Sequence, residues 1–373
     1  MNENDWSVPE TDVFDRVRTA LDERTEAVLA TVVDVDGSAY RRPGAKMLVD
    51  PAGVGAGSIT AGCVEDEVRQ LALEVLDDGE PRVETWDLTG DDDVWGMGVG
   101  CNGVVTVLLE PLDDSYRPVV DAVERGDDVG VVTAVGGDVA TGARTCYDPG
   151  EGFADGDLPD WVLADLEDVT ETLVAEGKAD TVRVEGEGRT AEVFVDGVQA
   201  PPNLVVFGSG HDVAPVVELA KLVDFHVTVV SYRGARSAPE DFPRADEVVS
   251  GSARDAADLV DFDDDTYVVV MTHNFLDDRM TLDGLLSTPV PYVGLMGPRE
   301  RFEQMLDDFA DEGVTVEQSD LDRIHTPVGL NLGGDSPYQI AYSIVAELLA
   351  VANDRTPQHL SEREGPIHER LEL

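Results

Sequence analysis

The fold of this chain is decided by the stretch Leu204-Val205-Val206-Phe207-Gly208-Ser209-Gly210-His211-Asp212-Val213. Its apolar start predicts a buried strand, its glycines permit a tight turn, and the residues that follow predict a helix over about 211–222. A strand, a glycine turn and a helix in this order are typical of a Rossmann-like unit that holds a pyrophosphate at the helix N-terminus. Gly208 and Gly210 are therefore candidate nucleotide-binding residues.

Two features of the dinucleotide pattern are missing. Val213 stands where glycine or alanine allows close packing, and Ser231 stands where an acid would bind ribose hydroxyls. Arg233 follows shortly after and is a further candidate nucleotide contact, better suited to an NADP-like phosphorylated ligand than to NAD. The alternative is a Rossmann scaffold kept for packing or dimerisation, because a fold alone does not establish a function.

Strands and helices alternate through the rest of the second half. We expect strands at 227–230, 247–249, 266–271 and 291–294, and helices at 253–260, 276–286, 298–309 and 338–351. This alternation predicts a doubly wound parallel sheet covered on both faces. His273 follows one of these strands and is a candidate catalytic acid or base, the alternative being a histidine that only hydrogen-bonds a turn.

The first half has a more mixed pattern. Two prolines and a glycine interrupt the chain at 195–203, which predicts a domain 1–199 of mixed α/β structure and a Rossmann-like domain 200–373. No internal repeat is apparent. In the first half we expect strands at 27–35, 46–49, 83–88, 104–109, 119–124, 129–135, 144–147, 181–184 and 190–195, and helices at 64–76 and 161–174.

Acidic side chains dominate the composition. There are 78 Asp and Glu residues against 26 Lys and Arg residues, and the formal net charge is −52. Such a surface repels itself in dilute buffer, and high salt screens that repulsion, so we expect a halophilic cytoplasmic protein. Nucleic acid is not an expected partner, because no basic face is available. The sequence has no run of apolar residues that could cross a membrane, and its acidic start excludes a signal peptide.

Two of the three cysteines stand among glycines. Cys63 follows Gly62 at the start of a predicted helix, and Cys101 follows Gly100. Glycine lets a backbone approach a ligand closely, and a helix start favours the thiolate that binds metal, although acids in the first helical turn oppose it. Both cysteines are candidate metal contacts, with buried inert thiols as the alternative. A zinc site has no support, because no C-x-x-C or H-E-x-x-H motif occurs.

Arg41, Arg42 and Lys46 form the densest positive cluster of this acidic chain. They are expected to attract a phosphorylated or carboxylated small molecule. The alternative is that they pair with some of the many carboxylates.

Together these motifs resemble those of the XdhC/CoxI family over nearly the whole chain. The matching segments are Gly37-Ser38, Arg41, Pro43-Gly44-Ala45, Met47, Gly62-Cys63-Val64-Glu65, Gly100-Cys101-Asn102-Gly103, Gly208–Gly210, Arg233, Thr272-His273, Gly294-Leu295-Met296-Gly297 and Pro327-Val328-Gly329-Leu330. Asn102 departs from the usual second glycine of its motif.

Members of that family are accessory factors of molybdenum hydroxylases such as xanthine dehydrogenase and carbon monoxide dehydrogenase. They bind the molybdenum cofactor (molybdopterin), assist its sulfuration and deliver it to the apo-enzyme. The resemblance implies a cofactor chaperone rather than a catalyst, partnered by a hydroxylase apo-enzyme and a cysteine desulfurase, and a homodimer. It implies cofactor-binding roles for Cys63, Cys101, Arg41, Arg42, Lys46, Gly62 and Gly100, with molybdenum contacts at the two cysteines.

Two other functions stay open at this point. The glycine turn at 208–210 suits an NAD(P)-dependent oxidoreductase that uses His273 as its acid or base. A non-enzymatic scaffold that dimerises through its Rossmann-like domain is the second alternative.

Overall fold

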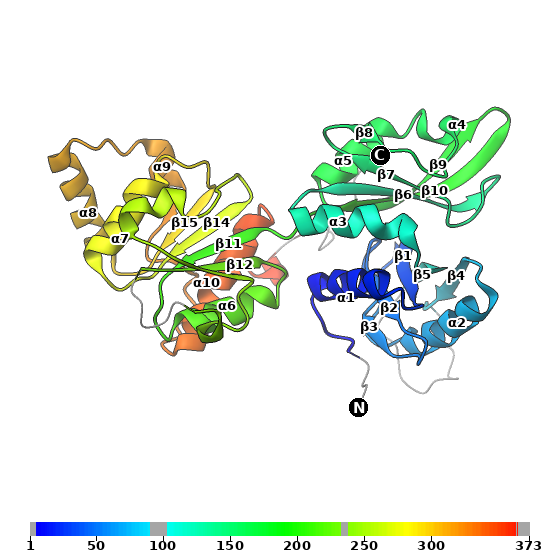
Figure 1. Ribbon diagram of the computed structural model, residues 1–373, viewed down its shortest axis with the longest axis horizontal. Coiled ribbons are helices and arrows are strands. Elements are labelled where there is room, and N and C mark those ends of the chain that lie inside the picture. The colour runs from blue at the N-terminus through cyan, green and yellow to red at the C-terminus, as the bar shows by residue number, and fades with distance from the viewer. Residues whose placement is uncertain (1–4, 90–102, 233–237, 363, 365–373) are drawn as a thin grey trace. The chain divides into compact units, whose positions relative to one another are not determined.

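The computed structural model describes residues 5–89, 103–232, 238–362 and 364. The chain divides into two compact units, which we call unit 1 (Met1–Ala200) and unit 2 (Pro201–Glu372). Figure 1 labels their helices and strands. Unit 1 has mixed α/β structure and unit 2 is built on a parallel sheet, so the predicted fold class is confirmed.

Unit 1 begins with a five-stranded antiparallel sheet, sheet A, whose strand order is β3-β2-β1-β5-β4. Its strands are β1 (Val28–Gly37), β2 (Lys46–Val49), β3 (Gly55–Gly57), β4 (Arg82–Asp87) and β5 (Gly103–Pro111). Helix α2 (Glu65–Asp78) covers one face, because Val68, Ala72 and Val75 recur at helical spacing and are fully buried against β1 and β5. Helix α1 (Glu10–Glu23) precedes β1 and was not anticipated from the sequence.

A second five-stranded antiparallel sheet, sheet B, has the order β8-β7-β6-β10-β9. Its elements are the 3₁₀ helix η1 (Asp114–Tyr116), α3 (Arg117–Arg125), β6 (Val129–Gly137), β7 (Arg144–Asp148), β8 (Gly152–Phe153), α4 (Asp160–Leu163), α5 (Glu167–Ala175), β9 (Ala179–Gly186) and β10 (Arg189–Val198). The predicted strand at 119–124 is wrong. A proline in the first turn and the left-handed Gly126 after the last turn delimit helix α3 instead.

The two sheets of unit 1 share one topology. In each, a helix precedes the first strand, a helix separates the third strand from the fourth, and the spatial order is third-second-first-fifth-fourth. A bulge recurs as well, at Val33 of β1 and Val135 of β6. Residues 10–111 and 117–198 are therefore a tandem structural repeat. The repeat is not apparent in the sequence, because little more than Gly-Ala before a cation (44–46 and 142–144) and a later Asp-Pro is retained.

Unit 2 contains sheet C, a six-stranded parallel sheet with the order β13-β12-β11-β14-β15-β16. The strands are β11 (Asn203–Phe207), β12 (His226–Ser231), β13 (Glu247–Ser250), β14 (Thr266–Val270), β15 (Tyr292–Leu295) and β16 (Ile324–His325). The strand order reverses between β11 and β14, which makes the carboxyl ends of these two strands the topological switch point of the sheet.

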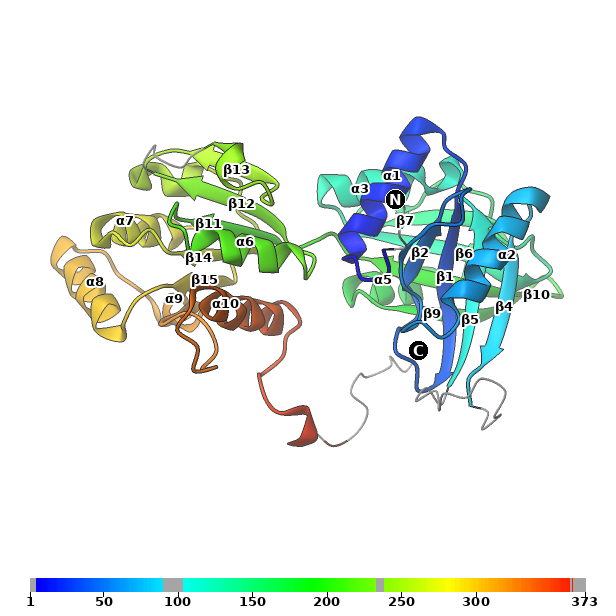
Figure 2. The same cartoon turned by 90° about the horizontal axis from the view of Figure 1, so that it is seen from below.

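Helices cover both faces of sheet C. One apolar cluster joins α6 (Val213–Lys221) and α10 (Pro337–Ala352) to one face, and another joins α7 (Phe275–Leu285) and α8 (Arg299–Glu312) to the other, as Figures 1 and 2 show. The remaining elements are α9 (Gln318–Asp322) and the 3₁₀ helices η2 (Pro239–Asp241), η3 (Ala253–Asp258) and η4 (Leu360–Glu362). The expected α-helix at 253–260 is thus a 3₁₀ segment.

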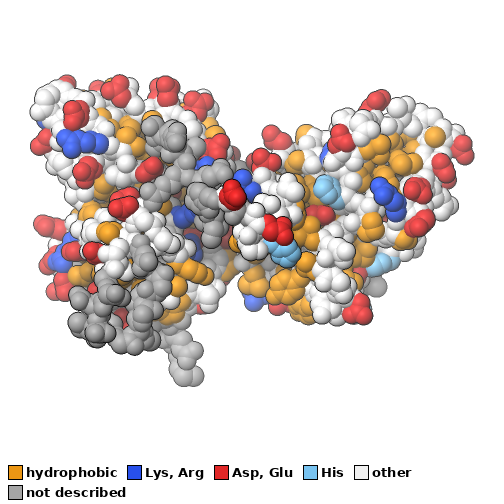
Figure 3. Space-filling model, turned by 180° about the vertical axis from the view of Figure 1, so that it is seen from behind, with side chains coloured by type: hydrophobic (Ala, Val, Ile, Leu, Met, Phe, Trp, Pro, Cys, Tyr) orange, Lys and Arg blue, Asp and Glu red, His pale blue; other side chains and the backbone are white. Residues whose placement is uncertain are grey.

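Acidic side chains are scattered over the visible surface of both units rather than gathered in one patch (Figure 3). Within the described part of the chain, none of the helices combines the length and the apolar character needed to cross a bilayer.

Candidate functional site

Two loops that carry sequence motifs leave sheet A toward the same end, where β5 also begins. β1 ends at Gly37, which pairs with Gly103, the first residue of β5. Beyond β1 the chain forms the basic loop (residues 38–45), and beyond β3 it forms the cysteine loop (residues 58–64). Because β2 and β5 run antiparallel to β1, and β3 antiparallel to β2, these segments all start or finish at one end of the sheet. The segment that enters β5 there carries Cys101, which lies with Gly100 outside the described residues.

Gly103 ties the entry of β5 to the start of the basic loop. A Cβ atom on Gly103 would lie 2.7 Å from the Ser38 carbonyl oxygen and 2.8 Å from that of Asp36. Only glycine permits so close a backbone approach. The Leu88 amide also donates to the Gly103 carbonyl at 3.0 Å, so both ends of the segment that holds Cys101 are fixed to the sheet.

A buried carboxylate builds the cysteine loop. Glu65, the first residue of α2, is 1% exposed and accepts hydrogen bonds from the Thr60 amide at 2.7 Å and the Thr60 hydroxyl at 2.6 Å. The Val64 amide donates to the same carboxylate at 3.2 Å, and the Cys63 amide donates to the Thr60 hydroxyl at 3.1 Å. Gly62 supplies the left-handed backbone of the turn, with φ 101°. The loop therefore presents Cys63 as an exposed thiol.

The three predicted cations are placed differently. Arg42 is exposed, and Arg41 is half-buried with its guanidinium paired to Glu10 of α1. Lys46 is 4% exposed, and its ammonium lies 2.5 Å from Asp196 Oδ2 and 2.9 Å from the Gly44 carbonyl oxygen. Burial alone would lower the pKa of Lys46, but attraction by Asp196 and Tyr116 and the hydrogen bond to Asp196 together outweigh it, and the pKa is raised. The Lys46 charge is thus satisfied inside unit 1, and we do not propose Lys46 as a direct cofactor contact.

The glycine turn of unit 2 lies at the switch point of sheet C. A Cβ atom on Gly208 would lie 2.7 Å from the Met271 carbonyl oxygen, so close packing of β11 on the end of β14 requires glycine there. Val213 is fully buried in the apolar core under α6. The residue at the third position of the dinucleotide pattern therefore serves the apolar core of unit 2. Ser231 is buried at the end of β12, and Arg233 lies outside the described residues.

A carboxylate lies beside this turn. His273 adopts a left-handed backbone, with φ 59°, and its Nε2 lies 2.7 Å from Asp212 Oδ2. Asp212 Oδ1 lies 2.3 Å from the position that a Cβ atom of Gly210 would take. A negative charge here opposes the approach of a pyrophosphate to the turn and the start of α6. His273 was a candidate from the sequence, but its partner Asp212 was not, because the fold alone brings the two together.

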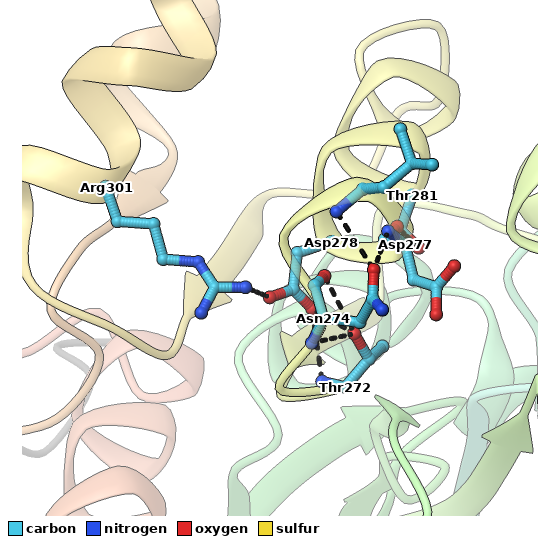
Figure 4. Close-up of polar contacts among 7 residues, drawn as sticks. Thr272, Asn274, Asp277, Asp278, Thr281 and Arg301 are labelled. Atoms are coloured by element: carbon cyan, nitrogen blue, oxygen red, sulfur yellow. Dashed lines mark hydrogen bonds and ion pairs between the residues drawn. The ribbon is translucent and has the colours of Figure 1, made fainter.

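Polar contacts shape the loop that carries His273 (Figure 4). The buried Asp278 carboxylate accepts from the Thr272 amide at 3.1 Å and its hydroxyl at 2.5 Å, and it pairs with Arg301 of α8. Asn274 caps α7 by accepting two backbone N–H bonds. Burial raises the pKa of Asp278 despite these bonds. The side chains of Asp278 and Asn274 thus hold the loop that carries His273 in place.

The end of sheet A and the switch point of sheet C suit different ligands. Within residues 5–89, 103–232, 238–362 and 364, no group of three or more His, Cys, Asp and Glu side chains is arranged to hold a metal ion. A ligand with a soft metal or sulfur and an anionic group suits the end of sheet A, which offers a thiol and arginines. The switch point of unit 2 offers a carboxylate and an imidazole.

This architecture defines a class of protein: a Rossmann-fold domain that follows a two-sheet α/β unit with an exposed thiol at one sheet end. Residues 11–87 match the model of the XdhC and CoxI family, and residues 204–348 match that of the XdhC Rossmann domain. With the relatives below, these matches show that the chain belongs to the XdhC and CoxI family.

Two relatives extend over nearly the whole chain. A probable xanthine dehydrogenase subunit of Bacillus subtilis (strain 168) is 30% identical over 334 residues, which are 88% of this chain and 94% of that protein. A crystal structure described as a xanthine dehydrogenase from Bacillus halodurans superposes with a TM-score of 0.75 at 27% identity, covering 93% of this chain and 97% of that one.

A shorter match links the chain to a chaperone. The molybdenum cofactor insertion chaperone PaoD of Escherichia coli (strain K12) is 33% identical over 100 residues, which are 26% of this chain and 30% of that protein.

Proposed function

We propose that this protein binds the molybdenum cofactor as cargo and supports its insertion into a molybdenum hydroxylase apo-enzyme of the xanthine dehydrogenase type. The observation that carries the proposal is the exposed Cys63 thiol, held by a carboxylate-built loop at the sheet end where the basic loop also starts. The family membership and the match to a cofactor insertion chaperone support it.

The chemistry assigns each group a task. A thiolate is a strong ligand for a soft metal centre and accepts or gives sulfur, so Cys63 and Cys101 are the proposed contacts to molybdenum and its sulfur. Arg42 and Arg41 are proposed to bind the phosphate of the pterin, because a guanidinium pairs with phosphate through two parallel hydrogen bonds. Arg41 would then exchange its bond to Glu10 for one to the cargo. Gly62 keeps the backbone beside Cys63 unobstructed, and Gly100 is proposed for the same role beside Cys101.

Three finer points belong to the same proposal. Sulfuration of the bound cofactor with sulfur from a cysteine desulfurase is proposed from the family resemblance, as is a homodimer. The net charge of −52 supports work in a salt-rich cytoplasm. We do not propose NAD(P)-dependent oxidoreduction, because the Asp212 carboxylate beside the glycine turn opposes a pyrophosphate.

Copurification tests this proposal. The protein is isolated at molar salt from cells that make the cofactor, and molybdenum and pterin are measured per mole of folded protein. Loss of one protein ligand or its support commonly weakens metal binding about 10- to 100-fold, so Cys63→Ala and Cys101→Ala should each lower retention strongly.

Cys146→Ala is the matched control, because Cys146 is a buried thiol on β7 of the second repeat and should leave retention unchanged. Equal cofactor retention by the wild type, Cys63→Ala and Cys101→Ala would refute the thiol role.

A further inference from the structure

We infer that the buried pair of Lys46 and Asp196 positions the basic loop, and that it is one of two reciprocal ion pairs that join the repeated halves of unit 1. The pairing itself is a property of the fold. Its consequence for cargo rests on the proposed function. The second half would then serve as a scaffold that holds the working loops of the first.

The repeat identifies which residues correspond. Lys46 on β2 pairs with Thr31 of β1, and Arg144 on β7 pairs with Thr133 of β6, so the two cations occupy the same site of the repeated topology. The acids correspond as well. Glu110 of β5 lies opposite Leu29 of β1, and Asp196 of β10 lies opposite Val131 of β6, two residues before each threonine.

The ion pairs cross between the halves. Lys46 of the first half binds Asp196 of the second, whereas Arg144 of the second half binds Glu110 of the first. The side chains are 5% and 8% exposed in both pairs. When residue i meets j of another copy and j meets i, the contact has the form of an isologous dimer interface. Unit 1 thus resembles a dimer of its own repeat, formed within one chain.

Aromatic rings repeat the same correspondence. The Lys46 ammonium lies 5.6 Å from the centre of the Phe14 ring, and the Arg144 guanidinium lies 5.0 Å from the centre of the Tyr116 ring. Phe14 comes from the helix of the first half, and Tyr116 directly precedes the helix of the second. Each cation therefore has a ring from the first helix of its own half, or from the residue directly before that helix, and an acid from the other half.

The halves differ in what the pairs support. Lys46 also donates to the Gly44 carbonyl oxygen at 2.9 Å, and a Cβ atom on Gly44 would lie 3.1 Å from Asp196 Oδ1. The pair therefore fixes the last turn of the basic loop. Arg144 instead donates to Thr133 at 3.2 Å and Ser115 at 3.0 Å.

The loop that corresponds to the basic loop, residues 138–143, contains no Lys or Arg. Helix α5 corresponds to α2, and the two helices begin alike, with Glu167-Asp168 and Glu65-Asp66. Two positions before its first residue, α5 has Asp165 where α2 has Cys63. The cations of the basic loop and the thiol of the cysteine loop thus have no counterparts at the corresponding positions of the second half. Removing one partner of a buried pair leaves an uncompensated charge, so loss of the Lys46–Asp196 pair should release the basic loop alone.

Amide hydrogen exchange at molar salt tests the inference, with Arg144→Met as the matched control for Lys46→Met. In Lys46→Met, exchange at Gly44 and Ala45 should accelerate at least about tenfold while 142–143 is unchanged, because local opening sets these rates. Arg144→Met should leave exchange at Gly44 and Ala45 unchanged, because Arg144 donates to Thr133 and Ser115 and not to the basic loop. Lys46→Arg should restore slow exchange. If Lys46→Met unfolds, the double variant Lys46→Met/Asp196→Leu tests the same point, because it leaves no buried unpaired charge.

Cofactor retention supplies the second readout. Lys46→Met should lose retention per folded molecule about tenfold, as outer-shell changes commonly do, and Arg144→Met should keep it. Equal exchange or equal retention in the two variants would overturn the positioning role. If the wild type itself carries no cofactor, the proposed function fails, while the exchange data still decide the inference.

Discussion

The sheet end of unit 1 that carries Cys63 and the switch point of unit 2 are built alike but differ in chemistry. In both, glycine packs a strand end directly against a backbone carbonyl, at Gly103 and at Gly208. In both, a buried acid shapes the loop, Glu65 in the first and Asp278 in the second. The first then presents an exposed thiol, and the second presents Asp212 bonded to His273. Position in the fold thus makes both of them candidate sites, and only the side chains distinguish the ligands that each would suit.

The largest expected effect separates the two described thiols. Burial raises the pKa of Cys146, so its reactive thiolate becomes scarcer at any pH below that raised value, and access is blocked as well. Cys63 is exposed and should react with iodoacetamide at pH 8 at least about a hundredfold faster. Peptide mass spectrometry measures both rates, with Cys63→Ala as the control for assignment. Comparable rates would contradict the presented thiol.

A matched pair of glycine substitutions sharpens the comparison next. Gly103→Ala and Gly208→Ala each place a Cβ atom 2.7 Å from a backbone carbonyl oxygen, and each should lower the free energy of unfolding of its own unit. Overpacking of this kind commonly costs about 1–3 kcal/mol. Denaturant titration at molar salt measures the loss, and only Gly103→Ala should also lower cofactor retention. Lower retention in Gly208→Ala alone would move the cargo site to unit 2.

The smallest effect is expected at the switch point. Asp212→Asn removes the charge beside the glycine turn. A charge at a helix N-terminus contributes about 0.3–1 kcal/mol, so the affinity for NADP should rise roughly two- to fivefold from a very weak value. Calorimetric titration at molar salt measures it, and Asp277→Asn, an acid in the first turn of α7, is the control. Tight NADP binding by the wild type would instead revive the oxidoreductase alternative.

The doubly wound unit was predicted well from the sequence, because hydrophobic periodicity and the glycine turn are local signals. The chain divides after Ala200, in the segment where two prolines and a glycine interrupt the sequence pattern. The repeat in unit 1 was not readable, since a shared topology needs only a similar pattern of burial and retains few identical residues. The true helix α3 was assigned to a strand, because its short apolar run Val119-Val120 fits either structure.

The candidate site was predicted in part. Cys63 and the arginines could be named from their types and spacing, and the resemblance added their roles. Lys46 could not be separated from Arg41 and Arg42, because its partner Asp196 lies 150 positions away in the chain. Glu65 could not be identified as the residue that builds the cysteine loop, because that role depends on burial.

X-ray absorption at the molybdenum K-edge tests the central claim, that a thiol at the sheet end of unit 1 contacts the cargo. The measurement uses protein copurified with cofactor, and compares wild type with Cys63→Ala and Cys146→Ala. We expect the number of sulfur neighbours of molybdenum to fall in Cys63→Ala and to stay constant in Cys146→Ala. Identical sulfur coordination in all three proteins would contradict the account.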